Sequence, residues 1–150
     1  MTTNNAINFF SFTPTTMWTP DLQFNGVDTG ITYSTNVGLY AQIDNVVFYF
    51  CLLVMTSIGS IYSGSELVTV AGLPINSNNS ISYIGTGSFG PSDGIIPVPI
   101  VYNNGATNTI YIQTDSTMDS SGNPSSASSL VQAQLNDNSI LQLSGYYLAM

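Results

Sequence analysis

The sequence predicts an all-β protein, an antiparallel β-sandwich with a jelly-roll-like arrangement. Short segments rich in Val, Ile, Tyr, Phe and Thr are separated by clusters of Gly, Pro, Asn and Ser, a spacing typical of sandwiches and barrels. Helical periodicity is scarce along the chain. The chain has 150 residues, a length that predicts one domain able to bury a core without disulfides or metal.

The predicted strands cover most of the chain. They are residues 23–24, 30–34, 38–43, 46–56, 66–71, 80–85, 96–102, 109–114 and 145–150. Pro97 and Pro99 make 96–102 an edge strand or an extended connector, because proline cannot donate a ladder hydrogen bond. Residues 129–143 fit two strands joined at the sequence NDN better than the alternative of a short helix.

Several glycines mark the predicted turns. Asn25–Gly26 and Asn104–Gly105 supply the positive φ angles of tight turns, and Pro74 in the sequence GLP ends a strand. Gly38 and Gly59 are also predicted to lie in turns.

Residues 46–55, with the sequence VVFYFCLLVM, have no polar break. The run is too short to cross a membrane, which takes about 20 apolar residues in a helix, and it has no basic flank typical of a signal sequence. Because polarity does not alternate, we expect a strand that is covered on both faces. The second sheet of the sandwich would cover one face and a neighbouring subunit the other, so the run predicts an oligomer.

The composition excludes many functions. The chain has no Lys, Arg or His and has eight acidic residues, which gives a net charge of −8. Catalysis by His, Ser–His–Asp triads, Schiff-base chemistry and lysine-dependent phosphate binding are therefore impossible. Nucleic acids and anionic membranes attract basic side chains, so no nucleic-acid binding and no membrane insertion are expected. The chain is predicted not to be an enzyme. The enzymatic alternative that the composition leaves open is a carbohydrate-active protein that uses two carboxylates.

Few residues are candidates for chemistry. Asp115 and Asp119 lie in a Ser- and Gly-rich segment and form a weak candidate for Ca²⁺, against the alternative of a solvated loop; no other cofactor is expected. Cys51 is interpreted as a small buried hydrophobic residue. The sequence Asn78-Asn79-Ser80 is a glycosylation site only if the chain passes through a eukaryotic secretory pathway.

Aromatic residues are the candidates for docking and oligomer contacts. Residues 1–14 form a predicted N-terminal arm whose apolar side chains would dock, and residues 15–150 form the sandwich domain. Trp18 is interpreted as a packing residue of the core or of a subunit contact, with sugar stacking as the alternative. The candidates are Phe9, Phe10, Phe12, Trp18, Phe48 and Phe50.

Residues 18–74 contain a specific series of motifs. These are WTP at 18–20, FNG at 24–26, TGITYS at 29–34, Gly38 with Tyr40, IDNVV at 43–47, Gly59-Ser60 with Gly64, and GLP at 72–74. The series resembles a β-sandwich module of phage tail-fibre and other particle-surface proteins of virions. The closing sequence LSGYYLAM also resembles the last strand of such modules. Gln42 and Ile58 stand where the family commonly has Lys, and Asp44 where Gly is usual, which puts charge-dependent partner contacts in doubt.

The resemblance implies a structural virion protein, a subunit of a phage fibre, spike or capsid decoration at the virion surface. It implies a homo-oligomer, for which we expect a trimer, with other virion proteins as partners and contact with a host-surface glycan as an additional expectation. It implies no catalytic residue. The alternatives are a cellular subunit of an extracellular filament or adhesin at the cell surface, and a glycan-binding or carbohydrate-active protein.

Overall fold

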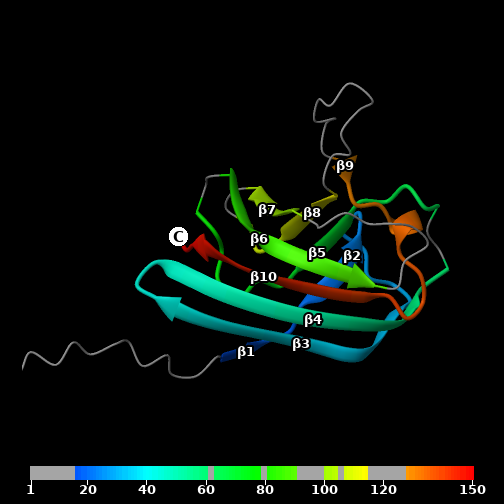
Figure 1. The fold of residues 1–150 in the computed structure, drawn as a ribbon, viewed down its shortest axis with the longest axis horizontal. Helices are drawn as coiled ribbons and strands as arrows, with labels where there is room; N and C mark the ends of the chain where they lie inside the picture. The colour runs from blue at the N-terminus through cyan, green and yellow to red at the C-terminus, as the bar shows by residue number, and fades with distance from the viewer. Residues whose placement is uncertain (1–15, 61–62, 79–80, 91–99, 105–106, 115–127) are drawn as a thin grey trace, which may run out of the picture.

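The computed structural model describes residues 16–60, 63–78, 81–90, 100–104, 107–114 and 128–150, which form an all-β structure (Figure 1). The predicted fold class is confirmed in this respect. The elements are β1 (Thr16–Trp18), β2 (Asp21–Phe24), β3 (Ile31–Ile43), β4 (Val46–Ile58), β5 (Val68–Ala71), β6 (Ile81–Gly90), β7 (Ile100–Asn104), β8 (Ile110–Thr114), β9 (Ser128–Ser129), the 3-10 turn η1 (Gln132–Gln134) and β10 (Ile140–Leu148).

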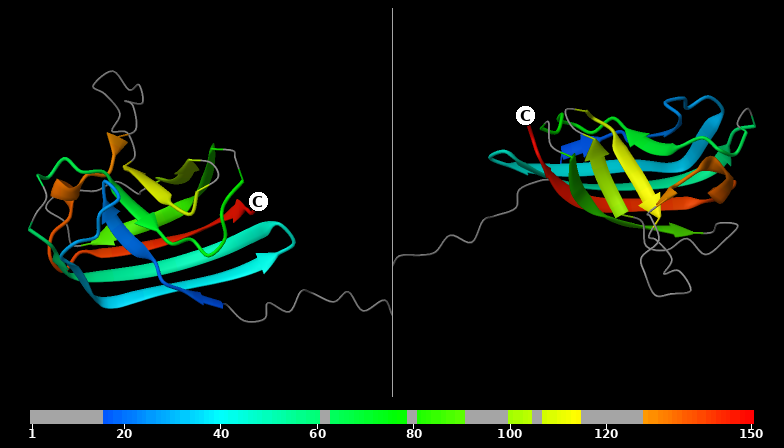
Figure 2. Two further views of the ribbon diagram at one scale, coloured as in Figure 1. Left: turned by 180° about the vertical axis from the view of Figure 1, so that it is seen from behind. Right: turned by 90° about the horizontal axis from the view of Figure 1, so that it is seen from above.

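The strands form two antiparallel layers. The first sheet has the order β1-β3-β4-β10-β6, and pairing continues from β6 into the second sheet, β7-β8-β5-β2, with β9 paired to β8. Figure 2 shows the strands of the second sheet lying over the first. The chain passes from the first sheet to the second between β1 and β2, at Thr19 and Pro20. This architecture is consistent with a β-sandwich.

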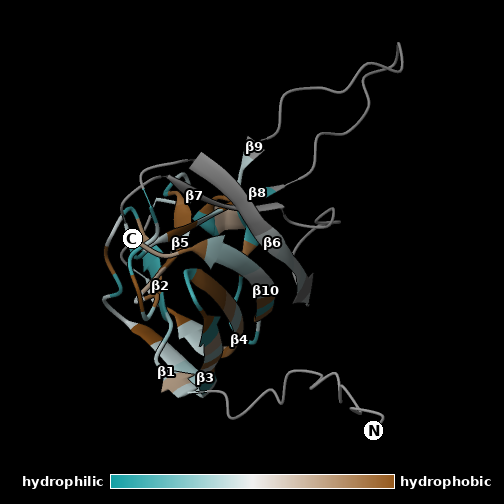
Figure 3. Ribbon diagram, turned by 90° about the vertical axis from the view of Figure 1, so that its left-hand side faces the viewer, coloured by the Kyte–Doolittle hydropathy of each residue, from teal (hydrophilic) through white to brown (hydrophobic). Residues whose placement is uncertain are grey.

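The core lies between the two sheets because their inward positions are apolar. Figure 3 shows hydrophobic segments on β4 and on β5, which belong to different sheets. Burial of such side chains stabilises the fold by about 1.5–3 kcal/mol each. The largest fully buried side chains are Phe24, Leu22, Leu53, Met55, Ile110, Ile112, Leu130, Leu141, Leu143, Val47 and Val68.

Several strand predictions are wrong. The predicted edge strand 96–102 corresponds to β7, which pairs with both β6 and β8. Two further errors concern the strands beside β4. Residues 30–34 and 38–43 belong to one strand, β3, which pairs with β4 along its length and has an irregular register at Tyr33. The predicted strand 145–150 is the second half of β10, whose first half lies in the segment predicted to form two strands. Both corrections have the same reason: β4 is long, and the strands on its two sides pair with it over most of its length.

Gly38 lies in the middle of β3, not in a turn as predicted. Its missing side chain leaves room for the indole ring of Trp18, since a Cβ atom there would lie 2.5 Å from the ring atoms Nε1 and Cε2. The Trp18 ring is buried, with 8% of the residue exposed, and its Nε1–H donates to the Leu39 carbonyl at 3.3 Å. The structure therefore places Trp18 in the core, where it closes the β1 edge of the sandwich.

The Asn25–Gly26 turn is confirmed. Both residues have positive φ angles, 51° and 81°, as a tight two-residue hairpin turn requires. The flanking residues exchange two backbone hydrogen bonds, Phe24 N–H to Val27 O at 2.8 Å and Val27 N–H to Phe24 O at 3.1 Å. The turn fixes the position of the Asn25 side chain at the end of β2.

We predict that Gly38→Ala destabilises the protein by about 1–3 kcal/mol, because the added methyl group overlaps the Trp18 ring. The free energy of unfolding by denaturant measures the effect. Gly90→Ala is the matched control, since a Cβ atom at Gly90 meets nothing within 4 Å. Equal losses in the two variants would contradict the packing of Trp18 on Gly38.

We predict different effects on stability when each of two buried tyrosines is replaced by phenylalanine. The Tyr147 hydroxyl donates to the Ile75 carbonyl at 2.8 Å, whereas the buried Tyr49 hydroxyl has no hydrogen-bond partner among the described residues. Tyr147→Phe should cost about 1 kcal/mol, and Tyr49→Phe should be neutral or stabilising, because it removes an unsatisfied polar group. Thermal unfolding of both variants tests this pair, and a larger loss for Tyr49→Phe would refute it.

Candidate functional site

The strand β4 has two chemically similar faces, and the residues that the structure describes cover one of them with a second layer. Its inward side chains are buried against the second sheet, and its outward side chains are half-buried or exposed. The first half of the prediction for residues 46–55 is therefore confirmed. No described residue forms a second layer over the outward side chains, which are Val46, Phe48, Phe50, Leu52 and Val54.

The register of the first sheet places more apolar side chains beside these. Residues paired directly across antiparallel strands share a face: Leu39 pairs with Phe50, and Ala41 and Tyr146 both pair with Phe48. We call this surface the outer face; its apolar members are Met17, Val37, Leu39, Ala41, Ile43, Val46, Phe48, Phe50, Leu52, Val54, Ile140, Tyr146 and Leu148. Neutral polar residues, Gln142 and Ser144, occupy the middle of β10.

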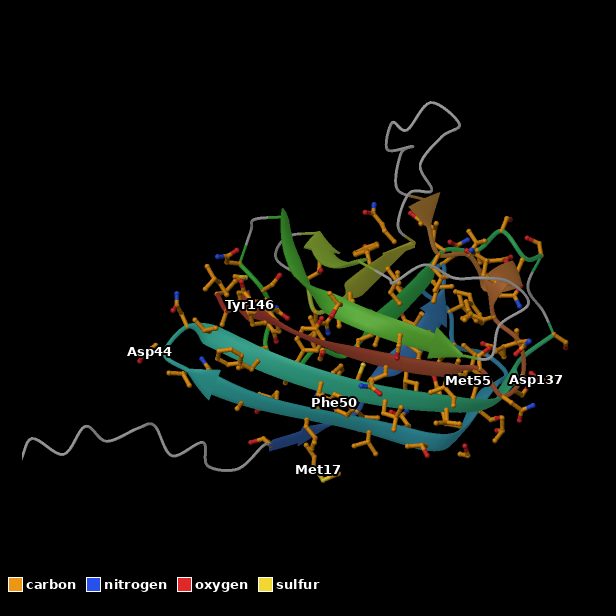
Figure 4. All side chains as sticks on the ribbon, in the orientation of Figure 1. Met17, Asp44, Phe50, Met55, Asp137 and Tyr146 are labelled. Atoms are coloured by element: carbon orange, nitrogen blue, oxygen red, sulfur yellow. The ribbon has the colours of Figure 1, made fainter. Side chains whose placement is uncertain are left out.

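The outer face contains large side chains that are open to solvent. Met17 is 71% exposed, Tyr146 60% and Phe48 39%. The rings of Phe48 and Tyr146 pack against each other with their centres 6.1 Å apart. Figure 4 shows Met17, Phe50 and Tyr146 along this sheet. The structure thus places the predicted docking residues Phe48 and Phe50 together on one surface.

The described carboxylates lie at the ends of the first sheet or outside it, and none lies in the middle of the outer face. Asp44 is in the turn between β3 and β4, and Asp137 precedes β10 at the other end of the sheet (Figure 4). Asp137 Oδ1 accepts the backbone N–H of Ile58 at 2.9 Å, so this carboxylate is tied to the end of β4. The middle of the outer face is therefore uncharged, in a chain whose ionised side chains are all negative.

The area of the first sheet lies at the lower end of the range of protein interfaces. The 9 residues of β10 span about 30 Å, and the distance from β1 to β6 is about 20 Å, so the sheet presents roughly 600 Å². The largest apolar patches of monomeric proteins reach about 300–600 Å², and a standard interface buries about 800 Å² of each partner.

A pocket with polar and apolar lining lies on the opposite side of the sandwich and was not predicted from the sequence. It has a volume of about 390 Å³. Its lining comes from β2, β5, β8 and the turns before or after them: Gln23, Asn25, Gly26, Leu67, Thr69, Thr109 and Tyr111. Only the strand pairing brings these residues together, so spacing along the sequence gave no signal for the pocket.

Other sequence candidates carry little further chemistry. Phe9, Phe10, Phe12, Asp115 and Asp119 lie outside the described residues. Over the described ranges, no group of three potential metal ligands is present, and no helix is long and apolar enough to span a membrane.

Cys51 lies in the core, as predicted. Burial raises the pKa of its thiol to about 12. The thiolate, which is the reactive form, is therefore disfavoured at neutral pH.

Glu66 organises the loop before β5. Its Oε1 accepts the backbone N–H of Ser63 at 2.7 Å and the Ser63 hydroxyl at 2.9 Å, and its Oε2 accepts the backbone N–H of Gly64 at 2.8 Å. These hydrogen bonds, led by the one from the Ser63 backbone, lower the pKa of Glu66 to about 2. The carboxylate thus satisfies the backbone N–H donors of Ser63 and Gly64 in this loop.

Comparison of the chain with family models, with curated proteins and with solved structures found no match. The resemblance to virion modules therefore stays a prediction from the sequence motifs.

We predict that the loop before β5 loses order in acid. The folded-state pKa of Glu66, about 2, lies below the ordinary value of 4.5, so its contribution is complete above pH 4.5 and is lost as the pH falls through about 2. Thermal unfolding across this range should show a fall in melting temperature that Glu66→Gln reduces. Asp28→Asn is the control, because no hydrogen bond to the Asp28 carboxylate occurs among the described residues. An identical acid response in the Glu66 variant would contradict this role.

Proposed function

We propose that this protein is a structural subunit that assembles with copies of itself through the outer face. The observation that carries the proposal is the apolar outward side of β4, flanked by apolar positions of β3 and β10. Exposing such a surface to water is unfavourable by about 25 cal/mol per Å². A second subunit removes that cost, as in obligate interfaces, which resemble a domain core cut in half.

The negative charge of the chain supports a second copy as the partner at the outer face. Every ionised side chain of the chain is negative, so two copies repel wherever their carboxylates approach each other. The described carboxylates lie in turns, in loops and on the other sheet, so contact through the middle of the outer face buries none of them. A partner rich in basic residues would gain nothing specific from this face.

The setting that we propose is the surface of a virus particle, where the protein would form part of a phage fibre, spike or capsid decoration. The support is the resemblance of residues 18–74 to virion modules. The trimer and the jelly-roll-like arrangement that this resemblance implies belong to the same proposal, as does docking through Phe9, Phe10 and Phe12 of the N-terminal arm onto other virion proteins. Co-purification with capsids would support this setting, and recovery with cellular filaments would favour the extracellular alternative.

We predict that Phe48→Glu and Tyr146→Glu each weaken self-association by at least about 30-fold, because loss of a central aromatic contact costs about 2 kcal/mol or more. Analytical ultracentrifugation over a concentration series measures the association constant, and circular dichroism verifies the fold.

Val27→Glu is the matched control, since Val27 is also an exposed apolar residue but follows the Asn25–Gly26 turn, away from the outer face. Self-association should survive in this variant. A wild-type protein that is monomeric at high concentration, or glutamate variants that associate like the wild type, would refute assembly through the outer face.

A further inference from the structure

The outer side of the second sheet differs in chemistry from the outer face of the first. Gln23 of β2 pairs with Thr69 of β5, and Thr69 pairs with Tyr111 of β8, so these side chains form one row across three strands. Asn25 and Gly26 in the turn after β2 and Thr109 before β8 extend the row into the pocket of about 390 Å³. Amide, hydroxyl and aromatic groups therefore converge on a single concave site.

The two amide side chains of the pocket are fixed in orientation. Gln23 Nε2 donates to Asp21 Oδ2 at 2.7 Å, which identifies that atom as the nitrogen and leaves Oε1 as an acceptor. Asn25 Oδ1 accepts the backbone N–H of Leu67 at 2.9 Å, which leaves Nδ2 as a donor. Neither remaining atom has a hydrogen-bond partner among the described residues. The site thus offers one acceptor and one donor that are already positioned.

We propose that this pocket binds a neutral carbohydrate. A sugar hydroxyl both donates and accepts, so adjacent hydroxyls of one ring can pair with Gln23 Oε1 and Asn25 Nδ2. The apolar face of a pyranose presents C–H groups, which suit the electron-rich surface of an aromatic ring such as Tyr111. A mostly preformed cavity with few polar groups at fixed positions is typical of small-molecule sites, whose volumes are about 300–1,000 Å³.

The charge of the chain selects among carbohydrates. No Lys, Arg or His is present anywhere in the sequence to pair with a carboxylate or sulfate. The Asp21 carboxylate, bound to Gln23, adds a negative charge beside the pocket. Acidic sugars such as sialic acid and glucuronic acid are therefore disfavoured, and neutral hexoses or N-acetylhexosamines are the class that the site accepts.

Carbohydrate binding at this site is independent of the proposed assembly. The pocket lies on the second sheet and the outer face on the first, so subunits that meet through the outer face leave the pocket open. The two proposals can consequently fail separately.

The test is an NMR titration of the full-length protein with glucose, galactose, mannose, N-acetylglucosamine and N-acetylgalactosamine, with sialic acid and glucuronic acid as acidic counterparts. We expect saturable shifts of pocket resonances with at least one neutral sugar and weaker or no binding of the acidic sugars. The titration is repeated on Phe48→Glu, in which binding should persist whatever its state of association.

Asn25→Asp is the decisive variant. It keeps the oxygen that accepts from Leu67 and, because Asp tolerates positive φ, keeps the turn, but it replaces the Nδ2 donor with an acceptor. Affinity for the sugar should fall about tenfold or more. Asn138→Asp is the matched control, since Asn138 also has a positive φ, 70°, and does not line the pocket.

Tyr111→Leu should also abolish binding while keeping an apolar residue at that position of β8. The proposal is overturned if no neutral sugar shifts the pocket resonances, if acidic sugars bind equally well, or if Asn25→Asp binds like the wild type.

Discussion

The structure depends on β4, a strand that is apolar on both sides and that the described residues cover with a second layer on one side. Its inward side chains form the centre of the core, and the strands β3 and β10 take their length and register from it. The same pairing aligns their outward apolar residues with those of β4. The strand pairing that builds the core therefore also builds the outer face. Polar substitutions on one strand would leave the apolar side chains of the two neighbouring strands in place.

The absence of basic side chains determines how the carboxylates are used. Glu66 and Asp137 both accept backbone N–H groups, at the loop before β5 and at the end of β4. Asp21 accepts a side-chain amide of Gln23. These three carboxylates have no basic side chain to pair with. They instead accept hydrogen bonds from amide groups in loops and on strands. These positions are also the ones that leave the middle of the outer face uncharged.

The sequence predicted what depends on local chemistry and missed what depends on pairing. The Asn25–Gly26 turn follows from φ preferences. The end of β5 was predicted from Pro74, which cannot donate a ladder hydrogen bond. Both effects act within a few residues. Gly38 was wrongly assigned to a turn. A glycine is required there because the ring of Trp18, distant along the chain, packs on it, and the local sequence does not show this contact. The pocket was invisible for the same reason, since Gln23, Thr69 and Tyr111 become neighbours only through the strand register. Phe48 and Phe50 were found because a long apolar run is a local signal.

The two sides of the sandwich are suited to different partners. The outer face disfavours polar ligands, and the pocket side disfavours an apolar sheet. The outer face has no fixed donors or acceptors at its centre apart from Gln142 and Ser144, so a polar ligand gains little there, whereas an apolar sheet of a second subunit gains its full area. The pocket on the second sheet has oriented amides and a single aromatic ring, so an apolar sheet would leave those amides unpaired at a cost. A partner on the second sheet would therefore have to supply hydrogen-bond groups for these amides. Copies of the chain that assemble through the first sheet consequently present the second sheet, with its pocket, to the surrounding solution.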